Sequence, residues 1–446
     1  MKAYSNYKDS GVSGIEQIPK HWILEKIKFV ATCNDEVLSD STADDEIINY
    51  IEIGDVDYVN GITNTTEYEF KEAPSRARRI TRPNDIIIST VRTYLKAIAK
   101  IAEPDLIVST GFAVIRPRKI DEIFMSYALL APTFIEEVMS RSFGVSYPAI
   151  KASSLMNIKI CIPLLSEQKA IASFLDAKTK PIDDIIAKRE KQIEFLEEMK
   201  SAIISRAVTK GLNSEAKMKD SGIEWIGEIP DHWDVKCIKY IKANVPNAFV
   251  DGPFGSNLKS QHYVEDGDVY VIESGFITSG KFEYVRDMKT ITEEHFETIK
   301  RSECKENDII IAKIGAYFGM AAVLPKLDKK SVVSGNSLKI TLDNTIMLND
   351  IFVYLMACSK KQNGYIGVVN ETAQPALSLY NLNHFKLPVA PLEEQEAIAS
   401  YLDSETSKID TRIAKRRKQI ELLQEYKQAL ITAAVTGKID VREYNS

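Results

Sequence analysis

Apolar side chains recur every three or four residues along two long segments that are copies of one another. The first, 167–211, begins EQKAIASFLD, and the second, 394–438, begins EQEAIASYLD. This spacing is typical of a helix with one apolar face, so we predict a long helix in each copy. The positions expected to pair the helices are Ile182, Ile186, Ile193, Leu196 and Ile203 in one copy and Ile409, Ile413, Ile420, Leu423 and Leu430 in the other. Two such stripes can bury each other, which predicts an antiparallel coiled coil.

Polar residues interrupt both apolar stripes. The seam contains Arg189 and Lys200 in the first copy, and Arg416 and Lys427 in the second. Polar residues in such a seam specify the register of the two helices and make the pair less stable than a uniformly apolar seam would. Pro181 is expected to begin a new helix, because prolines favour the first helical turn. That helix, ending near residue 209, is roughly 43 Å long at 1.5 Å per residue, somewhat longer than the ~34 Å turn of B-DNA.

A second repeat precedes each helical segment. DSGVSGIEQIPKHW at 9–22 returns as DSGIEWIGEIPDHW at 220–233, and each copy is followed by a body of different sequence. The chain therefore contains the order entry segment, body and helix twice. Such a repeat predicts two similar halves related by a pseudo-two-fold axis, with two different bodies.

The two bodies share short landmarks. NDIII at 84–88 and at 307–311 predicts a turn followed by a buried strand, and YPAI at 147–150 matches QPAL at 374–377. Apolar runs at 123–130 and 351–356 predict one helix in each body. Segments rich in β-forming residues with Gly, Asn and Asp turns predict hairpins, and the clearest of them are 56–61 and 277–282.

These patterns predict an α+β protein in which two β-rich mixed domains are joined by two long helices. The predicted ranges follow the borders of the repeats: 1–158 and 213–386 for the domains with their entry segments, and 159–212 and 387–446 for the helical regions. A chain of 446 residues is long enough to give each domain its own core.

Composition excludes several classes of protein. No apolar run is long enough to span a bilayer, and the N-terminus has no secretory signal, so we expect a cytoplasmic protein without a membrane partner. The five cysteines are widely spaced and form no CxxC pair, which predicts buried thiols and no zinc site. The net charge of −6 is weak evidence against nucleic acid, because docking depends on how the charge is distributed.

Catalytic motifs are absent. The segment Gly275–Phe282 has the GxxxxGK spacing of a phosphate-binding loop, but Phe282 replaces the required Ser or Thr. A strand-like FEYV follows where that motif needs a helix, so a hairpin turn explains the spacing. No nucleophile elbow, dinucleotide fingerprint or histidine pair for a metal appears. The sequence therefore favours a binding scaffold that is not itself an enzyme and binds no cofactor.

Basic and aromatic residues in both bodies are candidates for DNA contact. Clustered cations near an aromatic side chain are typical of nucleic-acid surfaces, although a solvated charged face explains the arginine run about as well. A glycine-rich loop in the second body would let backbone amides approach a phosphate, and a plain structural loop is an equal alternative there. The candidates are Arg76, Arg78, Arg79, Arg82, Arg92, Tyr94 and Lys96 in the first body, and Ser256, Asn257, Lys259, Lys313 and Tyr317 in the second.

Four motifs give the chain a family resemblance. DSGIEWIGEIPDHW, DGPFGSNLK, NDIIIAKIGAYFG and the twice-occurring EQxAIA helix resemble the specificity subunit of type I restriction-modification enzymes over essentially the whole chain. Two local departures concern the first half: Gly14 replaces the tryptophan found at Trp225, and the first body lacks the GPFGS loop.

The resemblance implies a division of labour. Each body would be a target recognition domain that reads one half of a split double-stranded DNA site, and the helices would measure the spacer and bind two methyltransferase (modification) subunits. Those partners would use S-adenosylmethionine to methylate adenine, and motor-nuclease subunits would add cleavage that depends on ATP and Mg²⁺. The basic helix face would serve either the partners or spacer phosphates; it consists of Lys188, Arg189, Lys191, Lys415, Arg416 and Lys418.

Two alternatives remain open at this stage. One is an orphan DNA-binding protein, or a subunit of a different DNA-defence system. The other is a coiled-coil scaffold whose bodies bind protein, and it predicts negligible DNA affinity even at low salt.

Overall fold

The computed structural model describes residues 2–12, 14–365, 369–370 and 376–444. The chain divides into two compact units: unit 1 is Met1–Lys191 with Arg416–Ser446, and unit 2 is Gln192–Lys415. Each unit contains one body and part of both long helices. These two units differ from the four ranges predicted from the repeats, because each long helix is shared between the units.

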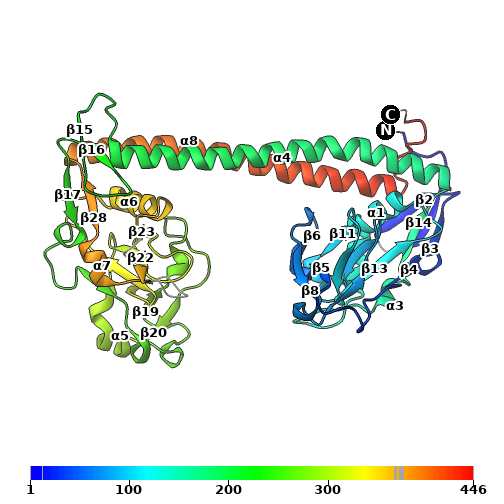
Figure 1. Ribbon diagram of the computed structural model, residues 1–446, viewed down its shortest axis with the longest axis horizontal. Helices are drawn as coiled ribbons and strands as arrows, with labels where there is room; N and C mark the ends of the chain where they lie inside the picture. The colour runs from blue at the N-terminus through cyan, green and yellow to red at the C-terminus, as the bar shows by residue number, and fades with distance from the viewer. Residues whose placement is uncertain (1, 13, 366–368, 371–375, 445–446) are drawn as a thin grey trace. The chain divides into compact units, whose positions relative to one another are not determined.

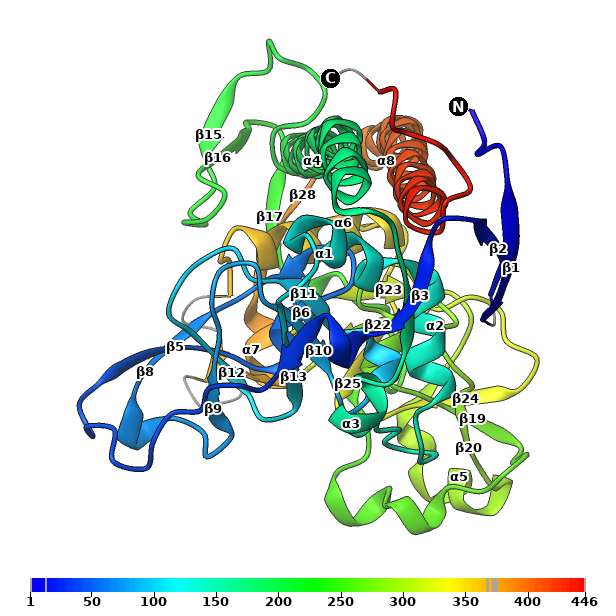
Figure 2. The same cartoon turned by 90° about the vertical axis from the view of Figure 1, so that its right-hand side faces the viewer.

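The two long helices are α4 (Leu165–Lys210) and α8 (Leu392–Val435), and they run side by side (Figures 1 and 2). The predicted restart at Pro181 is wrong, because α4 is continuous through this proline. A proline inside a helix costs about 3 kcal/mol, since it removes one hydrogen bond and crowds the preceding turn. Thr179 and Ile182 on either side of it are buried, so tertiary packing of the flanking residues offsets this cost.

Paired charges join the helices inside each unit. In unit 2 Lys200 Nζ lies 2.6 Å from Asp410 Oδ1, and in unit 1 Lys427 Nζ lies 2.6 Å from Asp183 Oδ1. The two ion pairs occupy corresponding positions of the repeat, and antiparallel helices bring them together twice. The ten residues predicted to pair the helices are all buried or half-buried.

The body of unit 1 consists of two four-stranded sheets with short helices. One sheet is antiparallel, with the order β11 (Ile98–Lys100), β10 (Ile86–Ser89), β13 (Phe112–Pro117), β4 (Ala31–Cys33). The other has the order β8 (Thr66–Glu69), β5 (Ile47–Ile51), β12 (Leu106–Ser109), β9 (Ala77–Ile80), and β5 and β12 are parallel. The helices are α1 (Glu122–Leu130), α2 (Pro132–Ser140) and α3 (Ala152–Leu155).

The body of unit 2 repeats this topology. Its sheets have the orders β23 (Ala321–Val323), β22 (Ile309–Ala312), β25 (Ser337–Ile340), β18 (Phe249–Asp251), and β20 (Lys289–Ile291), β19 (Val269–Ile272), β24 (Lys330–Val333), β21 (Glu303–Cys304). The parallel pair recurs as β19 and β24. The helices are α5 (Glu293–Ile299), α6 (Asn349–Lys361) and α7 (Leu379–His384). The α+β class and the internal repeat are thus confirmed.

The predicted landmarks have mixed outcomes. The NDIII segments form the buried strands β10 and β22, and α1 and α6 cover the predicted helices. The hairpin expected near 56–61 forms from β6 (Val56–Asp57) and β7 (Gly61–Ile62). The hairpin at 277–282 and the strand at FEYV are wrong: residues 277–285 contain turns and no strand, and Ser279 Oγ donates to Glu283 Oε1 at 2.7 Å. Gln374 and Pro375 lie outside the described residues.

The two entry segments have the same structure, which explains why their sequence is repeated. Each forms a small hairpin, β1 (Tyr7–Val12) with β2 (Ile15–Pro19) and β15 (Met218–Asp220) with β16 (Glu228–Pro230), followed by a buried tryptophan. Trp22 packs on Gly437 beyond α8, and Trp233 packs on Gly211 beyond α4. Both glycines have φ above +70°, a left-handed conformation that ends a helix and that glycine adopts without strain.

A Glu–Gln pair near the start of each long helix bonds to other parts of the same unit. Glu167 bonds with His21 and Glu394 with His232. Gln168 Oε1 accepts from the Asp121 amide at 2.8 Å, and Gln395 Oε1 accepts from the Leu348 amide at 2.9 Å. Further strand pairs beside these motifs are β3 (Ile23–Lys26) with β14 (Lys159–Ile162) and β17 (Asp234–Cys237) with β28 (Lys386–Val389).

The cysteines are only partly as predicted. Cys161, Cys304 and Cys358 are buried, but Cys33 and Cys237 are half-buried. Burial raises the pKa of the Cys161 and Cys304 thiols to about 12. Across the described ranges no single helix is long and apolar enough to cross a membrane, and α1 with α2 reaches that length only across a bend of 61°.

Candidate nucleic-acid interface

Each body presents a loop at the same place in its fold. In unit 1 the loop 90–96 follows the buried strand β10, and Val91 forms a bridge with Ala149. In unit 2 the loop 313–319 follows β22, and Ile314 forms a bridge with Ala376. The predicted contacts Arg92, Tyr94 and Lys96 lie on the first loop, and Lys313 and Tyr317 lie on the second. The topology therefore brings candidates from both bodies to corresponding loops.

The two loops share a backbone conformation but differ in side chains. Arg92 and Lys96 both have φ of 51°, and the corresponding residues of unit 2 are Gly315 and Gly319, with φ of 87° and 80°. Left-handed backbone favours glycine, and a side chain there costs about 1 kcal/mol. Unit 1 thus holds two strained basic residues where unit 2 has glycine. Strain of this kind is typical of functional sites.

The tips of both loops reach solvent. Tyr94 and Tyr317 are about half exposed, and the Arg92 guanidinium lies over the Tyr147 ring, 5.2 Å from its centroid. Lys96 is also exposed. Lys313 is buried instead, where its Nζ lies 3.7 Å from Asp251 Oδ2 and 4.1 Å from the Phe254 ring centroid. Burial lowers the pKa of Lys313, and Asp251 partly opposes this.

The four arginines of the run 76–82 differ in their surroundings. Arg76 is exposed, whereas the three other arginines contact neighbouring groups of unit 1. Arg78 lies over the Phe70 ring at 4.9 Å, Arg79 donates to the Thr110 carbonyl at 3.4 Å, and Arg82 pairs with Glu36. Burial also lowers the pKa of Arg79. The run is therefore only partly available to a phosphate.

The glycine-rich loop of unit 2 follows β18. Gly252 is required there, because a Cβ would lie 1.9 Å from the Ser334 carbonyl oxygen. The predicted contacts Ser256 and Lys259 are exposed, and the Asn257 carbonyl bonds with His295 Nε2 at 2.9 Å. This loop presents exposed polar groups, as a phosphate contact requires.

One exposed segment was not among the predicted contacts. Residues 142–149 of unit 1 form a hairpin beside the 90–96 loop and carry exposed Phe143, Val145 and Tyr147. The available signal was a run of apolar residues around a glycine and before a proline, SFGVSYP, with no acidic residue. A single sequence does not tell whether such residues face the core or solvent.

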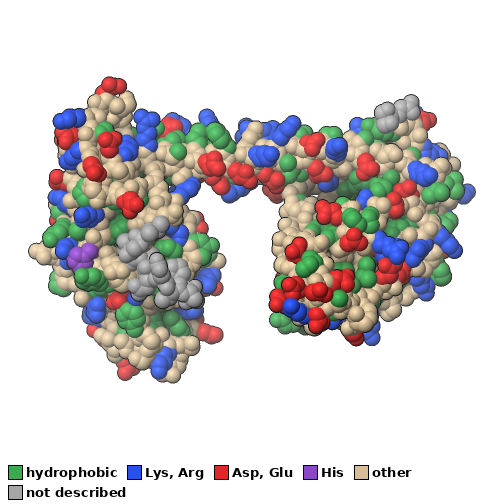
Figure 3. Space-filling model, in the orientation of Figure 1, with side chains coloured by type: hydrophobic (Ala, Val, Ile, Leu, Met, Phe, Trp, Pro, Cys, Tyr) green, Lys and Arg blue, Asp and Glu red, His purple; other side chains and the backbone are tan. Residues whose placement is uncertain are grey.

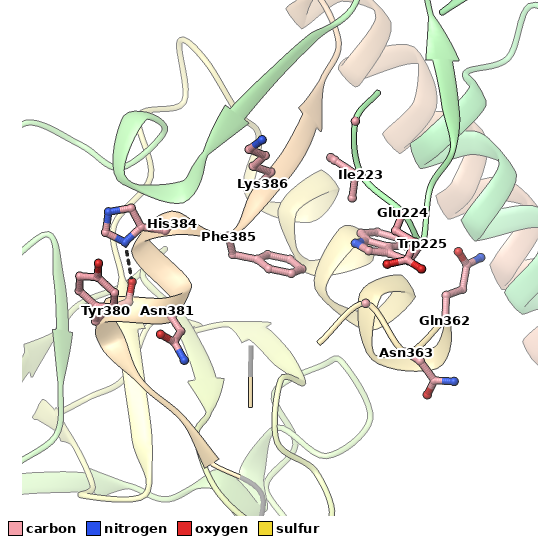
Figure 4. A pocket seen from close by; sticks show the side chains of 12 residues that line it. Ile223, Glu224, Trp225, Gln362, Asn363, Tyr380, Asn381, His384, Phe385 and Lys386 are labelled. Carbon is pink, nitrogen blue, oxygen red and sulfur yellow. Dashed lines mark hydrogen bonds between the residues drawn. The ribbon is translucent and has the colours of Figure 1, made fainter. Parts of the chain in front are cut away.

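A cavity of about 550 Å³ lies elsewhere in unit 2 (Figure 4). Trp225 and Gln362 lie on one side of it, and Tyr380 and His384 on the other, where His384 Nδ1 bonds with the Tyr380 carbonyl at 2.9 Å. Its lining contains no paired nucleophile and base among the described residues. Within the same residues, no group of three or more His, Cys, Asp or Glu could hold a metal ion.

Charge is mixed over most of the visible surface. Figure 3 shows basic and acidic side chains interspersed on both bodies and along the helices. With a net charge of −6, contacts with a polyanion depend on local clusters such as the strained loop of unit 1.

Comparisons with known proteins identify relatives of this chain. The family model of the type I restriction modification DNA specificity domain matches residues 23–195 and 255–422. The MjaVIII specificity subunit of Methanocaldococcus jannaschii is 26% identical over 73% of this chain and 72% of its own. The MjaIX specificity subunit of the same organism is 26% identical over 96% of each chain. One solved structure comes from work on the structural basis of complex assembly and conformational transition of the type I R-M system. The match covers 95% of this chain and 99% of that chain, with 19% sequence identity. Its TM-score of 0.67 supports the fold. This chain belongs to the family of type I restriction-modification specificity subunits.

Proposed function

We propose that each body reads one half of a bipartite, asymmetric DNA site. The observation that carries the proposal is the pair of corresponding loops with different side chains, Arg92 and Lys96 in unit 1 against Gly315 and Gly319 in unit 2. A pseudo-two-fold protein matches two half-sites, and bodies that carry different side chains at corresponding places would not contact the two half-sites alike. The two half-sites would then differ in sequence.

The paired helices would set the unread spacer between the half-sites. At about 1.5 Å per residue, the 46 residues of α4 extend roughly 69 Å, about two turns of B-DNA at ~34 Å each. This is longer than the arm expected with a break at Pro181. The ion pairs Lys200–Asp410 and Lys427–Asp183 fix the register of the two helices.

The helices would also bind two modification subunits, which are adenine-N6 methyltransferases. Phe195 on α4 and Leu422 on α8 occupy corresponding positions of the repeat and are 64% and 51% exposed. Two exposed residues at equivalent positions of the repeat suit two copies of one partner. S-adenosylmethionine, ATP and Mg²⁺ would be held by the partner subunits, and motor-nuclease subunits would join through the complex.

Body exchange tests the reading proposal. Residues 28–158 are replaced by the same region of another family member, and the methylated DNA motif is determined by single-molecule sequencing. One half of the motif should change while the other half and the spacer stay the same. A change in both halves would contradict the assignment of one body to one half-site.

Stoichiometry tests the partner proposal. Phe195→Asp and Leu422→Asp each place a charge in one proposed contact, so native mass spectrometry should count one modification subunit instead of two, and none in the double variant. Ile23→Asp, which changes an exposed apolar residue outside the helices, is the matched control. If the unaltered chain brings no methyltransferase from its host, the orphan alternative is favoured.

A further inference from the structure

The hairpin 142–149 of unit 1 is tightly built. Phe143 and Ala149 exchange two backbone hydrogen bonds of 2.9 Å, which close the hairpin. Gly144 has φ of 108°, and a Cβ there would lie 3.1 Å from the Tyr147 carbonyl oxygen. Only glycine adopts this conformation at such close range without strain. The tip is therefore a defined turn that holds its side chains in place.

Those side chains are unusually exposed. Phe143, Val145 and Tyr147 have relative exposures of 82%, 102% and 66%. Single exposed apolar residues are ordinary on protein surfaces, but three within five residues form a patch that marks an interaction site.

The strained loop 90–96 anchors the hairpin. Thr93 donates its amide to the Pro148 carbonyl at 3.2 Å and its hydroxyl contacts Ser142 Oγ at 2.8 Å. The Ile150 amide donates to the Thr90 carbonyl at 2.9 Å. The apolar tip and the cations Arg92 and Lys96 therefore form one structural element.

The charge of this element favours a polyanion as its partner. The segments 89–96 and 141–151 contain no Asp or Glu, although the chain as a whole carries a net charge of −6. Their cations are Arg92, Lys96, Arg141 and Lys151, of which Arg141 pairs with Glu137 of α2. An apolar wedge flanked by cations is how proteins unstack and kink a duplex while holding its phosphates.

We propose that the 142–149 hairpin inserts Phe143 or Val145 between two base pairs of the half-site read by unit 1, with Arg92 and Lys96 on the flanking phosphates. The inference rests on the proposed DNA-reading function and deepens it. Part of the selectivity of unit 1 then comes from how easily a base step is unstacked, which favours pyrimidine–purine steps.

A fluorescence experiment tests the insertion. The full chain, purified with the subunits that accompany it, is bound to a duplex carrying its methylated motif, with 2-aminopurine placed at successive positions outside the methylated adenine. Unaltered protein should raise the fluorescence at one step of a single half-site. The variant Phe143→Ala/Val145→Ala should abolish that rise and weaken binding about tenfold, since an unstacked base loses its apolar partner. Phe29→Ala is the matched control, because this aromatic residue of unit 1 is also exposed but lies outside the hairpin.

The outcomes separate the two proposals. If the unaltered chain fails to distinguish its motif from unrelated DNA, the reading function itself is contradicted. If it binds the motif without any fluorescence rise, or if the control loses as much as the hairpin variant, the insertion is overturned while the reading function stands. A hairpin variant that keeps both the rise and the affinity but no longer binds anionic vesicles or a partner subunit would also overturn it.

Discussion

Replacing the strained cations of unit 1 by glycine should change stability and DNA binding in opposite directions. Lys96 has φ of 51° in an exposed position, so Lys96→Gly relieves a left-handed residue and should stabilise unit 1 by about 1 kcal/mol. Arg92→Gly relieves the same strain but loses the contact with the Tyr147 ring, worth about 0.5 kcal/mol at an exposed site. Its net gain should be about 0.5 kcal/mol by the same reasoning.

DNA binding should weaken at the same two positions. If each side chain neutralises one phosphate, the slope of log K against log salt should become shallower by about 0.9 per substitution. Thermal unfolding of Lys96→Gly should show a rise in midpoint of about 2–4 °C. Titrations of labelled duplex at several salt concentrations measure the slope. A lower unfolding midpoint, or an unchanged slope, would refute the reasoning.

Unit 2 provides the reverse control. Gly315 has φ of 87° and no atom within 4 Å of where a Cβ would lie. Gly315→Ala therefore adds only backbone strain and should destabilise unit 2 by about 1 kcal/mol. Its salt slope should not change, since no charge is added or removed.

Three further predictions concern the scaffold. Gln395→Leu leaves the Leu348 amide and the Ala390 carbonyl without their partner, so urea unfolding should show a loss of about 2–4 kcal/mol; a loss below 1 kcal/mol would mean that these groups find other partners. The cycle of Lys200→Met and Asp410→Asn should give a coupling of about 0.5 kcal/mol that falls with added salt, and a coupling independent of salt would argue against an ion pair. Because burial raises the pKa of Cys161 and Cys304 to about 12, iodoacetamide at pH 8 should modify these thiols far more slowly than the half-buried Cys237, as peptide mass spectrometry can check.

The sequence predicted the features that rest on local pattern and repetition. The long helices follow from the spacing of apolar residues, the strands at the NDIII segments from a turn followed by an apolar run, and the duplication from the repeated sequence. The break at Pro181 was wrong because packing around Thr179 and Ile182 outweighs the local preference of proline. The strand at FEYV was wrong for a similar reason, since β-forming residues alone do not provide a partner strand.

The candidate site was harder to predict because it depends on exposure and backbone conformation. The four arginines near residue 80 look alike in sequence, yet Arg78, Arg79 and Arg82 have partners within unit 1. The strain at Arg92 and Lys96 and the exposure of the 142–149 hairpin are properties of the folded chain. Spacing carried no sign of either property.

The proposed function gives this chain control over which DNA sequence is methylated. The most direct test is a genome-wide map of adenine methylation by single-molecule sequencing, in the native host and in a strain that lacks the chain. We expect one split, asymmetric motif that is methylated in the host and unmethylated in the deletion strain, and whose methylation returns when the chain is supplied again. If the methyltransferase partner is expressed and no motif is lost on deletion, the claim is contradicted.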